Sequence, residues 1–335
     1  MGHYYLASGY SHGQKDDLIL FRVSGSGKME IISACRQGDS PSFLCTMGKK
    51  IYAVSEQPAY AAVTAYVLQK GKLAPVKRIE FAGAGLCHLY AGEKVLYASC
   101  YGSGHMYVLD DQLRDILYCH EGRKGFKGMA SRMHWTVMPD RNTLLAADCG
   151  SSRVYVYSLR DGVPYGSVGE IPLKEGSGPR QILFDRKTES AVIVNEQEGT
   201  LLFAKSRFWE QKTGNFPGEL AESIPTTQRR SSGNYPGGAC INSRGELFVA
   251  NRGENTIGMF RLGGRCSYLG EWDCSGIWPR YLHAAEENLL FAACERSGQV
   301  NSFVQRDGRL LLADSIPLSG AACVVPVEAD KTHGQ

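Results

Sequence analysis

One kind of segment occurs seven times along this chain of 335 residues, and this repetition limits the fold more than any other feature. Each copy is a short run of apolar, β-prone residues that ends in small or polar residues and a turn. The copies are YYLASGY, IYAVSEQ, LYASCYG, LLAADCG, AVIVNEQ, LFVANRG and LFAACER. Equivalent positions in successive copies are roughly 45 residues apart, so seven units account for the whole chain.

Three further runs accompany each copy and predict four strands per unit. A turn separates each copy from a second run that alternates like a strand, and two strands joined by a tight turn form a β-hairpin. The second runs are DLILFRV, AVTAYVL, HMYVLDD, RVYVYSL, TLLFAKS, TIGMFRL and QVNSFVQ. A third run follows in each unit, as in PVKRIEF, and a fourth precedes the repeated segment, as in HWTVMP.

The first unit lacks its own fourth run, because the chain begins at the repeated segment. A matching run, AACVVPV, stands at the other end of the chain, at residues 321–327. Such units are typical of propeller blades, and a strand from the far terminus closes the ring and removes an open edge. A large β-sandwich, the alternative, does not account for seven similar units with one strand displaced. The sequence therefore predicts an all-β fold, a single seven-bladed β-propeller domain over residues 1–335.

Charge and hydropathy exclude two classes of partner. The formal net charge is +3, and the only conspicuous basic cluster is the pair Arg229 and Arg230, so a nucleic-acid binder's electrostatic footprint is missing. No apolar run approaches the roughly 18 residues that a membrane-spanning helix needs. We therefore expect neither nucleic acid nor a membrane as a partner.

The cysteines and the first residues suggest a cellular compartment. Eleven cysteines, an odd number without a CxxC pair, are spread through apolar segments. The opening MGHYYLASGYSHG has no basic stretch followed by an apolar core, so it does not resemble a secretory signal. These features predict reduced thiols in a cytoplasmic protein. No Cys or His residues stand at zinc-ligand spacing, so we expect no metal.

Blade geometry predicts which residues converge. The first strand of a blade lines the central channel and the second runs antiparallel beside it, so the start of one and the end of the other share a rim. The residues at the strand starts are Ser42, His88, His134, Arg180, Gly238 and Arg280. Those at the neighbouring strand ends are Glu56, Tyr101, Cys149, Glu196, Arg252 and Glu295.

These positions hold the residue types that attack on an ester requires: a base that titrates near neutral pH and cations that stabilise an oxyanion. A channel lined by whatever tolerates water is the alternative. Glu196, between Arg180 and Arg252, either orients the arginines as an ion pair or transfers protons. His88 is followed by Leu89 and Tyr90, so a core position is an alternative for it, and His134 is the better candidate.

Several segments resemble the bacterial seven-bladed 6-phosphogluconolactonase (lactonase) family. They are SGPRQILFDRKTESAVIVNEQEGTL, YPGGACINSRGELFVANRGENTIGMF and IWPRYLHAAEENLLFAACERSGQVNSF, with further matches in the other units. The family is related to a fungal carboxy-muconate cycloisomerase. In both, a His, two Arg and a Glu at the propeller axis form the proposed active site. By motif, these four match His134, Arg180, Glu196 and Arg252.

The resemblance implies a cytoplasmic carboxylic ester hydrolase that converts 6-phosphogluconolactone to 6-phosphogluconate in the pentose phosphate pathway. His134 or Glu196 would be the general base, and Arg180 and Arg252 would stabilise the oxyanion. Arg132 or Arg280 would hold the phosphate. The full set of expected substrate contacts is His88, Arg132, Arg280, Tyr101 and Glu56. No cofactor is needed, because a lactone is already an activated ester.

Two departures from the family pattern leave the substrate open. Where many members have P-H-x-H, this chain has Ser131, Arg132, Met133 and His134, and where they have GPRH it has Gln181. Two proton carriers are lost and one cation is gained. The alternatives are hydrolysis or lactonisation of another organic acid, and a non-catalytic propeller that binds a ligand or a protein through the same rim.

Overall fold

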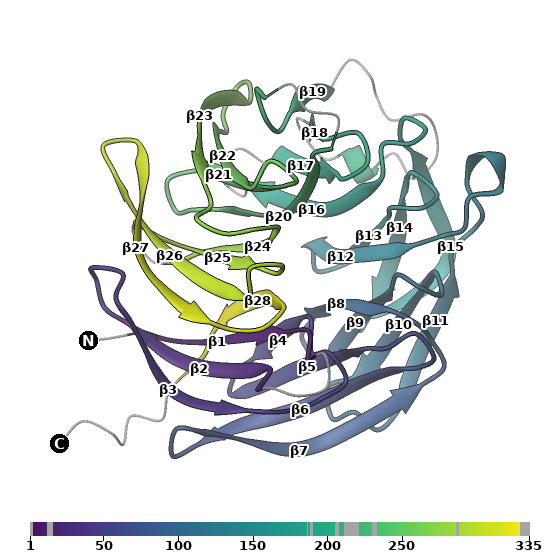
Figure 1. The fold of residues 1–335 in the computed structure, drawn as a ribbon. Coiled ribbons are helices and arrows are strands. Elements are labelled where there is room, and N and C mark those ends of the chain that lie inside the picture. Colours follow the sequence, from purple (N-terminus) through teal and green to yellow (C-terminus); the bar gives the residue numbers. More distant parts are fainter. Residues whose placement is uncertain are drawn as a thin grey trace.

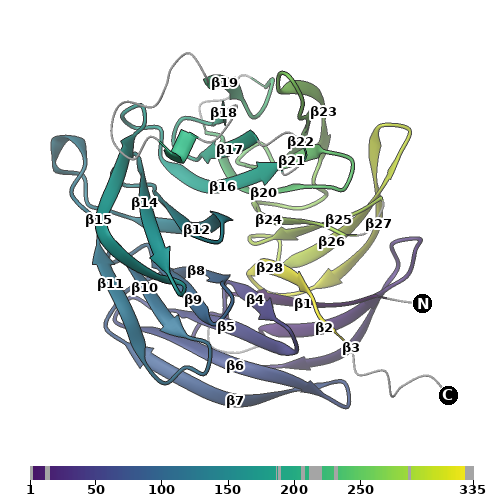
Figure 2. The ribbon, with the colours of Figure 1, turned by 180° about the vertical axis from the view of Figure 1, so that it is seen from behind.

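The strands of the computed structural model form seven four-stranded antiparallel sheets around a central axis, which Figures 1 and 2 show from its two sides. The structure describes residues 3–11, 16–185, 187, 190–204, 208–210, 221–229, 233–285 and 288–328. In these ranges the helical segments are η1 (Phe126–Gly128) and η2 (Phe208–Glu210), and no helix has the length and apolar character needed to cross a membrane. The predicted seven-bladed propeller is confirmed.

The strands of each blade are listed from the axis outward, and all but those of blade 1 are consecutive in the chain. Blade 1 contains β28 (Ala321–Pro326), β1 (His3–Gly9), β2 (Leu18–Val23) and β3 (Met29–Cys35). Blade 2 contains β4 (Leu44–Met47), β5 (Lys50–Glu56), β6 (Ala61–Gln69) and β7 (Lys72–Phe81). Blade 3 contains β8 (Leu86–Ala91), β9 (Val95–Cys100), β10 (His105–Asp110) and β11 (Ile116–Glu121). Blade 4 contains β12 (Met133–Asp140), β13 (Thr143–Asp148), β14 (Arg153–Arg160) and β15 (Val163–Pro172).

The remaining three blades complete the ring. Blade 5 contains β16 (Pro179–Asp185), β17 (Ser190–Asn195), β18 (Thr200–Ala204) and β19 (Ala221–Pro225). Blade 6 contains β20 (Tyr235–Ile241), β21 (Glu246–Arg252), β22 (Thr256–Arg261) and β23 (Ser267–Asp273). Blade 7 contains β24 (Pro279–Ala284), β25 (Leu289–Cys294), β26 (Gln299–Arg306) and β27 (Arg309–Pro317).

The C-terminal strand β28 completes blade 1. It pairs antiparallel with β1, in a register that places Leu6 opposite Val325 and Ala7 opposite Val324. Without β28, the main-chain groups of β1 on this side would have no strand partner, and an open edge would face the axis. The predicted closure of the ring is confirmed.

Apolar side chains of the middle strands fill the spaces between blades. All six residues of β9 are buried, whereas most of the outer strand β7 is exposed or half-buried. Buried tyrosines also link successive blades through their hydroxyl groups. The Tyr52 hydroxyl donates to the carbonyl oxygen of Asp111 (2.8 Å), and that of Tyr97 donates to the carbonyl oxygen of Gly162 (2.7 Å). Packing and polar contacts between blades thus hold the axial strands in place.

Six of the seven innermost strands have a β-bulge near their start, including those of blades 3, 4, 5 and 7. The register shifts between Leu86 and His88 in β8, Met133 and Trp135 in β12, Pro179 and Gln181 in β16, and Pro279 and Tyr281 in β24. The residues left unpaired are Cys87, His134, Arg180 and Arg280. A bulge bends its strand and redirects a side chain. Three of these four side chains are among the residues expected at the axis.

Candidate active site

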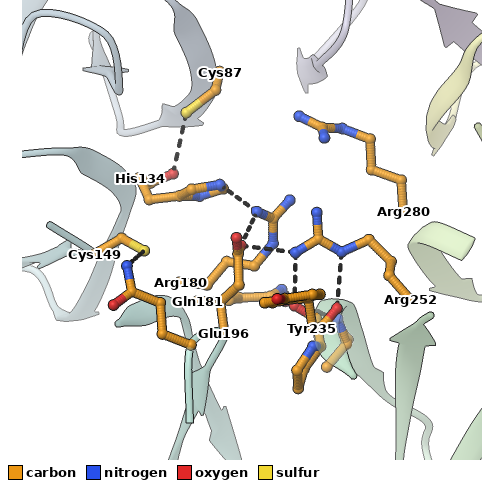
Figure 3. Close-up of polar contacts among 12 residues, drawn as sticks. Cys87, His134, Cys149, Arg180, Gln181, Glu196, Tyr235, Arg252 and Arg280 are labelled. Carbon is orange, nitrogen blue, oxygen red and sulfur yellow. Dashed lines mark hydrogen bonds and ion pairs between the residues drawn. The ribbon is translucent and has the colours of Figure 1, made fainter. Parts of the chain in front are cut away.

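Four side chains from blades 4, 5 and 6 form one contact network at the axis, shown in Figure 3. Arg180 Nη1 lies 2.5 Å from Glu196 Oε2 and 2.6 Å from His134 Nε2. Arg252 Nη2 lies 2.8 Å from the same Glu196 oxygen. We call His134, Arg180, Glu196 and Arg252 the quartet. The structure thus brings together the four residues that blade geometry and motif both indicated.

Main-chain geometry holds the quartet from both strand ends. His134 and Arg180 occupy the bulges of β12 and β16, and Glu196 directly follows β17, where its N–H donates to the Gly178 carbonyl (2.7 Å). Arg252 is the last residue of β21, and its guanidinium donates to the carbonyl oxygens of Tyr235 (2.9 Å) and Pro236 (3.1 Å). The arginine side chains are therefore preorganised before any ligand arrives.

Blade 6 contributes no side chain at the position that Arg180 and Arg280 hold in their blades. Its innermost strand has Gly237 and Gly238 there, inside a bulge between Pro236 and Ala239. A Cβ atom on Gly237 would lie 2.8 Å from the carbonyl oxygens of both Pro279 and Arg280, so only glycine fits. The close approach of the two backbones explains the PGG sequence in this blade.

Electrostatics fix the charge of each quartet member. Burial disfavours the Glu196 carboxylate, but Arg180 and Arg252 outweigh it and hold its pKa well below the usual range. Burial and the Arg180 charge lower the pKa of His134 well below 6.5. Burial lowers the pKa of Arg252 to about 10, which leaves it charged at neutral pH. With a neutral imidazole, the quartet carries one excess positive charge.

The contact with Arg180 also fixes the His134 tautomer. A guanidinium can only donate, so His134 Nε2 is the acceptor and the ring proton lies on Nδ1. His134 Nδ1 is buried and has no hydrogen-bond partner among the described residues. A neutral imidazole in this state can accept a proton at Nε2 once Arg180 moves its hydrogen bond elsewhere.

A second polar cluster faces the quartet from blades 7, 1 and 2. Arg280 lies 3.3 Å from Glu295 and 3.9 Å from Glu56, and its guanidinium stacks on the ring of Tyr10 at 5.0 Å. The hydroxyl groups of Tyr10 (2.7 Å) and Ser42 both donate to Glu56 Oε2. Figure 3 shows Arg280 beside Arg252, with both guanidinium groups directed toward the centre of the view. The carboxylates of Glu56 and Glu295 outnumber the single Arg280 cation, so this cluster has an excess negative charge.

Sequence reasoning missed Tyr10 as a member of this cluster. The signal was present, since Tyr10 ends the first copy of the repeated segment, the position that Glu56 and Glu295 hold in theirs.

The chain matches known proteins over nearly its whole length. Residues 4–326 match the model of the family described as lactonase, 7-bladed beta-propeller. The chain belongs to this lactonase family. It is 26% identical to the 6-phosphogluconolactonase of Bacillus subtilis (strain 168), over 94% of this chain and 95% of that protein.

Two solved structures share the lactonase fold over nearly their whole length. One is a candidate 6-phosphogluconolactonase from Bacteroides uniformis, with a TM-score of 0.86, 21% identity, and coverage of 97% of this chain and 99% of that one. The other is a periplasmic gluconolactonase from Pseudomonas aeruginosa, with a TM-score of 0.85, 18% identity, and coverage of 98% and 99%. At these identities the likeness shows the fold.

In this lactonase-family chain, Tyr101 and Arg132 border the quartet. The Tyr101 ring contacts the His134 ring edge-on at 5.6 Å, and the Arg132 guanidinium lies 4.9 Å from the centre of the Tyr101 ring. Arg132 is exposed and has no ion pair with the described residues. Both were expected substrate contacts, and the structure places them beside His134.

His88 is buried and forms no hydrogen bond or ion pair with the quartet among the described residues. It is 1% exposed, its ring packs 3.7 Å from that of Trp135, and its Nδ1 accepts from the Thr136 N–H (3.3 Å). The bulge explains the difference from the expected rim position: the residue of blade 3 equivalent to His134 is Cys87, one position earlier. We therefore leave His88 out of the proposed site.

Three other polar side chains near the axis have structural roles. The Gln181 amide donates to and accepts from the main chain of Ala239 (3.0 and 2.7 Å), so it joins blades 5 and 6 and cannot carry protons. Burial raises the pKa of the Cys149 thiol to about 12, and that of Cys87 is raised as well, so both stay protonated.

Within the part of the chain that the structure describes, no three His, Cys, Asp or Glu residues cluster as a metal site.

Proposed function

We propose that this protein hydrolyses the lactone of a sugar acid, with 6-phosphogluconolactone as substrate and 6-phosphogluconate as product. It would then be a carboxylic ester hydrolase of the pentose phosphate pathway. One observation carries the proposal: two buried guanidinium groups meet at a single carboxylate, and one of them also contacts the imidazole of His134. Membership in the lactonase family and the relative named 6-phosphogluconolactonase support the reaction and the first substrate to test.

The charge difference across the axis orients the substrate in this proposal. The lactone carbonyl faces Arg180 and Arg252, whose guanidinium groups stabilise the oxyanion that forms on attack. The hydroxyl groups of the sugar ring face Glu56 and Glu295, because a carboxylate accepts hydrogen bonds from hydroxyls. Each half of the channel thus matches one half of the substrate.

His134 is the better candidate for the general base. The Glu196 carboxylate is a weak base, because two arginines hold its pKa far below neutral pH. When the oxyanion takes the Arg180 hydrogen bond, His134 Nε2 is free to accept a proton from the attacking water. The water oxygen bonds to the carbonyl carbon, the bond to the ring oxygen breaks, and that oxygen leaves with the proton from His134.

The test is the rate at which purified protein accelerates the loss of fresh 6-phosphogluconolactone over its spontaneous hydrolysis. We expect Arg180→Lys to lower kcat by about 100-fold or more. Arg180 Nη1 alone contacts both Glu196 and His134, so an ammonium in its place leaves no second nitrogen of a planar fork to donate to the oxyanion. The unfolding temperature should change less in Arg180→Lys than in Arg180→Ala, since the charge beside Glu196 remains. An active, folded Arg180→Ala protein would refute the assigned site.

An unphosphorylated sugar lactone is the second candidate substrate. Arg280, an expected phosphate contact, is flanked by Glu56 and Glu295. Their excess negative charge would repel a phosphate dianion. Assaying gluconolactone beside 6-phosphogluconolactone under the same conditions separates the two substrates.

We also propose a cytoplasmic location. All eleven cysteines are free in the structure, and most are buried. Titration in denaturant under anaerobic conditions, without prior reduction, should find eleven thiols. A smaller number would reveal a disulfide and favour an oxidising compartment, such as the one named for the Pseudomonas aeruginosa relative.

A further inference from the structure

A groove between blades 7 and 1 lies next to the cluster around Arg280. Its volume is about 1000 Å³, and it is lined on one side by Arg36 and on the other by Glu295 and Arg296. Glu295 also forms an ion pair with Arg280 near the axis. The groove and the channel therefore share one side chain, and a ligand that lies in both would pass over it.

Arg296 is held in place on an aromatic ring that also contacts the quartet. Its guanidinium carbon lies 3.4 Å from the centre of the Trp278 ring, and that of Arg252 lies 5.4 Å from the same ring. Cation–π contact of this kind reduces the freedom of an exposed arginine. Trp278 thus connects a buried arginine of the quartet with an exposed arginine of the groove.

The backbone of Trp278 is fixed in a conformation that few residues adopt. Its φ is +64°, in the left-handed region. Its N–H donates to Asn255 Oδ1 (2.8 Å), its carbonyl accepts from the Glu295 N–H (3.0 Å), and the Arg296 N–H donates to the Ile277 carbonyl (3.1 Å). Such strain persists only where the surroundings impose it, and it is concentrated at functional sites.

The two arginines of the groove carry charges that the described residues do not neutralise by ion pairing. Neither Arg36 nor Arg296 has a carboxylate oxygen within 4.0 Å among those residues. Glu295 is already paired with Arg280, which leaves Asp16 as the other acidic residue of the lining. The groove therefore keeps an excess positive charge, unlike the cluster around Arg280.

We propose that Arg296, held on Trp278, and Arg36 bind the phosphate group of a phosphorylated sugar-acid lactone whose ring reaches into the channel. The proposal rests on the function proposed above and names the site that would select a phosphorylated substrate. The planar donor fork of arginine suits phosphate oxygens. Trp278 is a positioning residue in this proposal, because it orients Arg296 without touching the reacting atoms.

The first test compares two substrates. For Arg296→Gln and Arg36→Gln we expect KM for 6-phosphogluconolactone to rise about 10-fold or more, with kcat nearly unchanged. Both constants for gluconolactone should stay as in the wild type. Arg160→Gln is the matched control, because the Arg160 guanidinium also stacks on an aromatic ring, that of Tyr165 at 4.6 Å. Arg160 is at the end of β14 that is remote from the quartet, so it should not contact the substrate.

Arg132→Gln tests the other exposed, stacked arginine of the rim. If this variant raises KM for the phosphorylated lactone while Arg296→Gln leaves it unchanged, the phosphate binds beside Tyr101 and the proposal is wrong. An equal loss on both substrates in Arg296→Gln would also overturn it, because that outcome indicates a structural role only.

A binding measurement separates failure of this proposal from failure of the proposed function. Calorimetry with 6-phosphogluconate and with gluconate needs no turnover. Tighter binding of the phosphorylated acid that disappears in Arg296→Gln supports the groove site even if the protein hydrolyses neither lactone. Hydrolysis of the phosphorylated lactone with the same KM and the same 6-phosphogluconate affinity in Arg296→Gln overturns the groove site and leaves the proposed function standing.

Discussion

At the scale of single residues, the contact between Arg180 Nη1 and His134 Nε2 explains most about the site. The Arg180 guanidinium donates to the lone pair on His134 Nε2, the same lone pair that a general base must use. Such a contact requires a neutral imidazole. Burial and Arg180 then lower the pKa of His134 well below 6.5. The same Arg180 is thus both a candidate donor to the oxyanion and the group that keeps the base unprotonated.

A pH profile tests this coupling. The base is active when neutral, so activity is present above its pKa and is lost as pH falls through it. Because the pKa of His134 is lowered, the acid limb of kcat/KM should lie below pH 6.5. Glu196 raises that pKa, so the residual activity of Glu196→Gln should have its acid limb at still lower pH. An acid limb at or above pH 6.5 in the wild type would contradict the assignment of His134.

At the scale of strands, the bulges decide which residues face the axis. Sequence repetition located the strands and predicted their ends well enough to find His134, Arg180, Glu196 and Arg252. It could not predict that one residue at each bulge drops out of the pairing. In blade 3 this shift of one residue moves His88 into the core and brings Cys87 to the axial position. The two arginines of the groove, Arg36 and Arg296, and Trp278 lie in connections between strands, where the sequence has no periodic pattern.

His88→Leu tests the bulge register. The substitution removes the acceptor of the Thr136 N–H, so we expect a loss of unfolding free energy of about 1 kcal/mol. Lactone hydrolysis per folded molecule should stay within about two-fold of the wild type, since the side chain lies outside the quartet. His134→Leu is the matched control and should abolish most activity. Thermal unfolding and steady-state assays of both variants provide the two measurements, and a loss of activity in folded His88→Leu would restore His88 to the site.

At the scale of the whole molecule, the ring depends on a strand from the far end of the chain. β28 supplies the innermost strand of blade 1, and its residues pack in the core: Ala321, Cys323 and Val324 are at most 1% exposed. The displaced strand was predictable from the sequence because the first unit is one run short. The overall architecture was therefore more accessible to sequence reasoning than the surface grooves between blades.

Truncation tests the closure. A chain that ends before Gly320 lacks β28 and exposes both the edge of β1 and the apolar surface that β28 covers. We expect insoluble protein, or protein without a cooperative unfolding transition. A chain that ends at Glu328 keeps β28 and serves as the control. Soluble, cooperatively unfolding protein from the shorter chain would show that the ring does not need this strand.

The opposite charges of the two halves of the channel have a kinetic consequence for the end of each turnover. In the proposed reaction a lactone would enter with a neutral ester, and hydrolysis would convert that ester into a carboxylate at the place where Arg180 and Arg252 lie. The newly formed anion would be attracted by these two arginines and repelled by Glu56 and Glu295, which lie around Arg280. Departure of the acid, rather than cleavage of the ester, would then limit the steady-state rate, and added product would compete strongly with substrate.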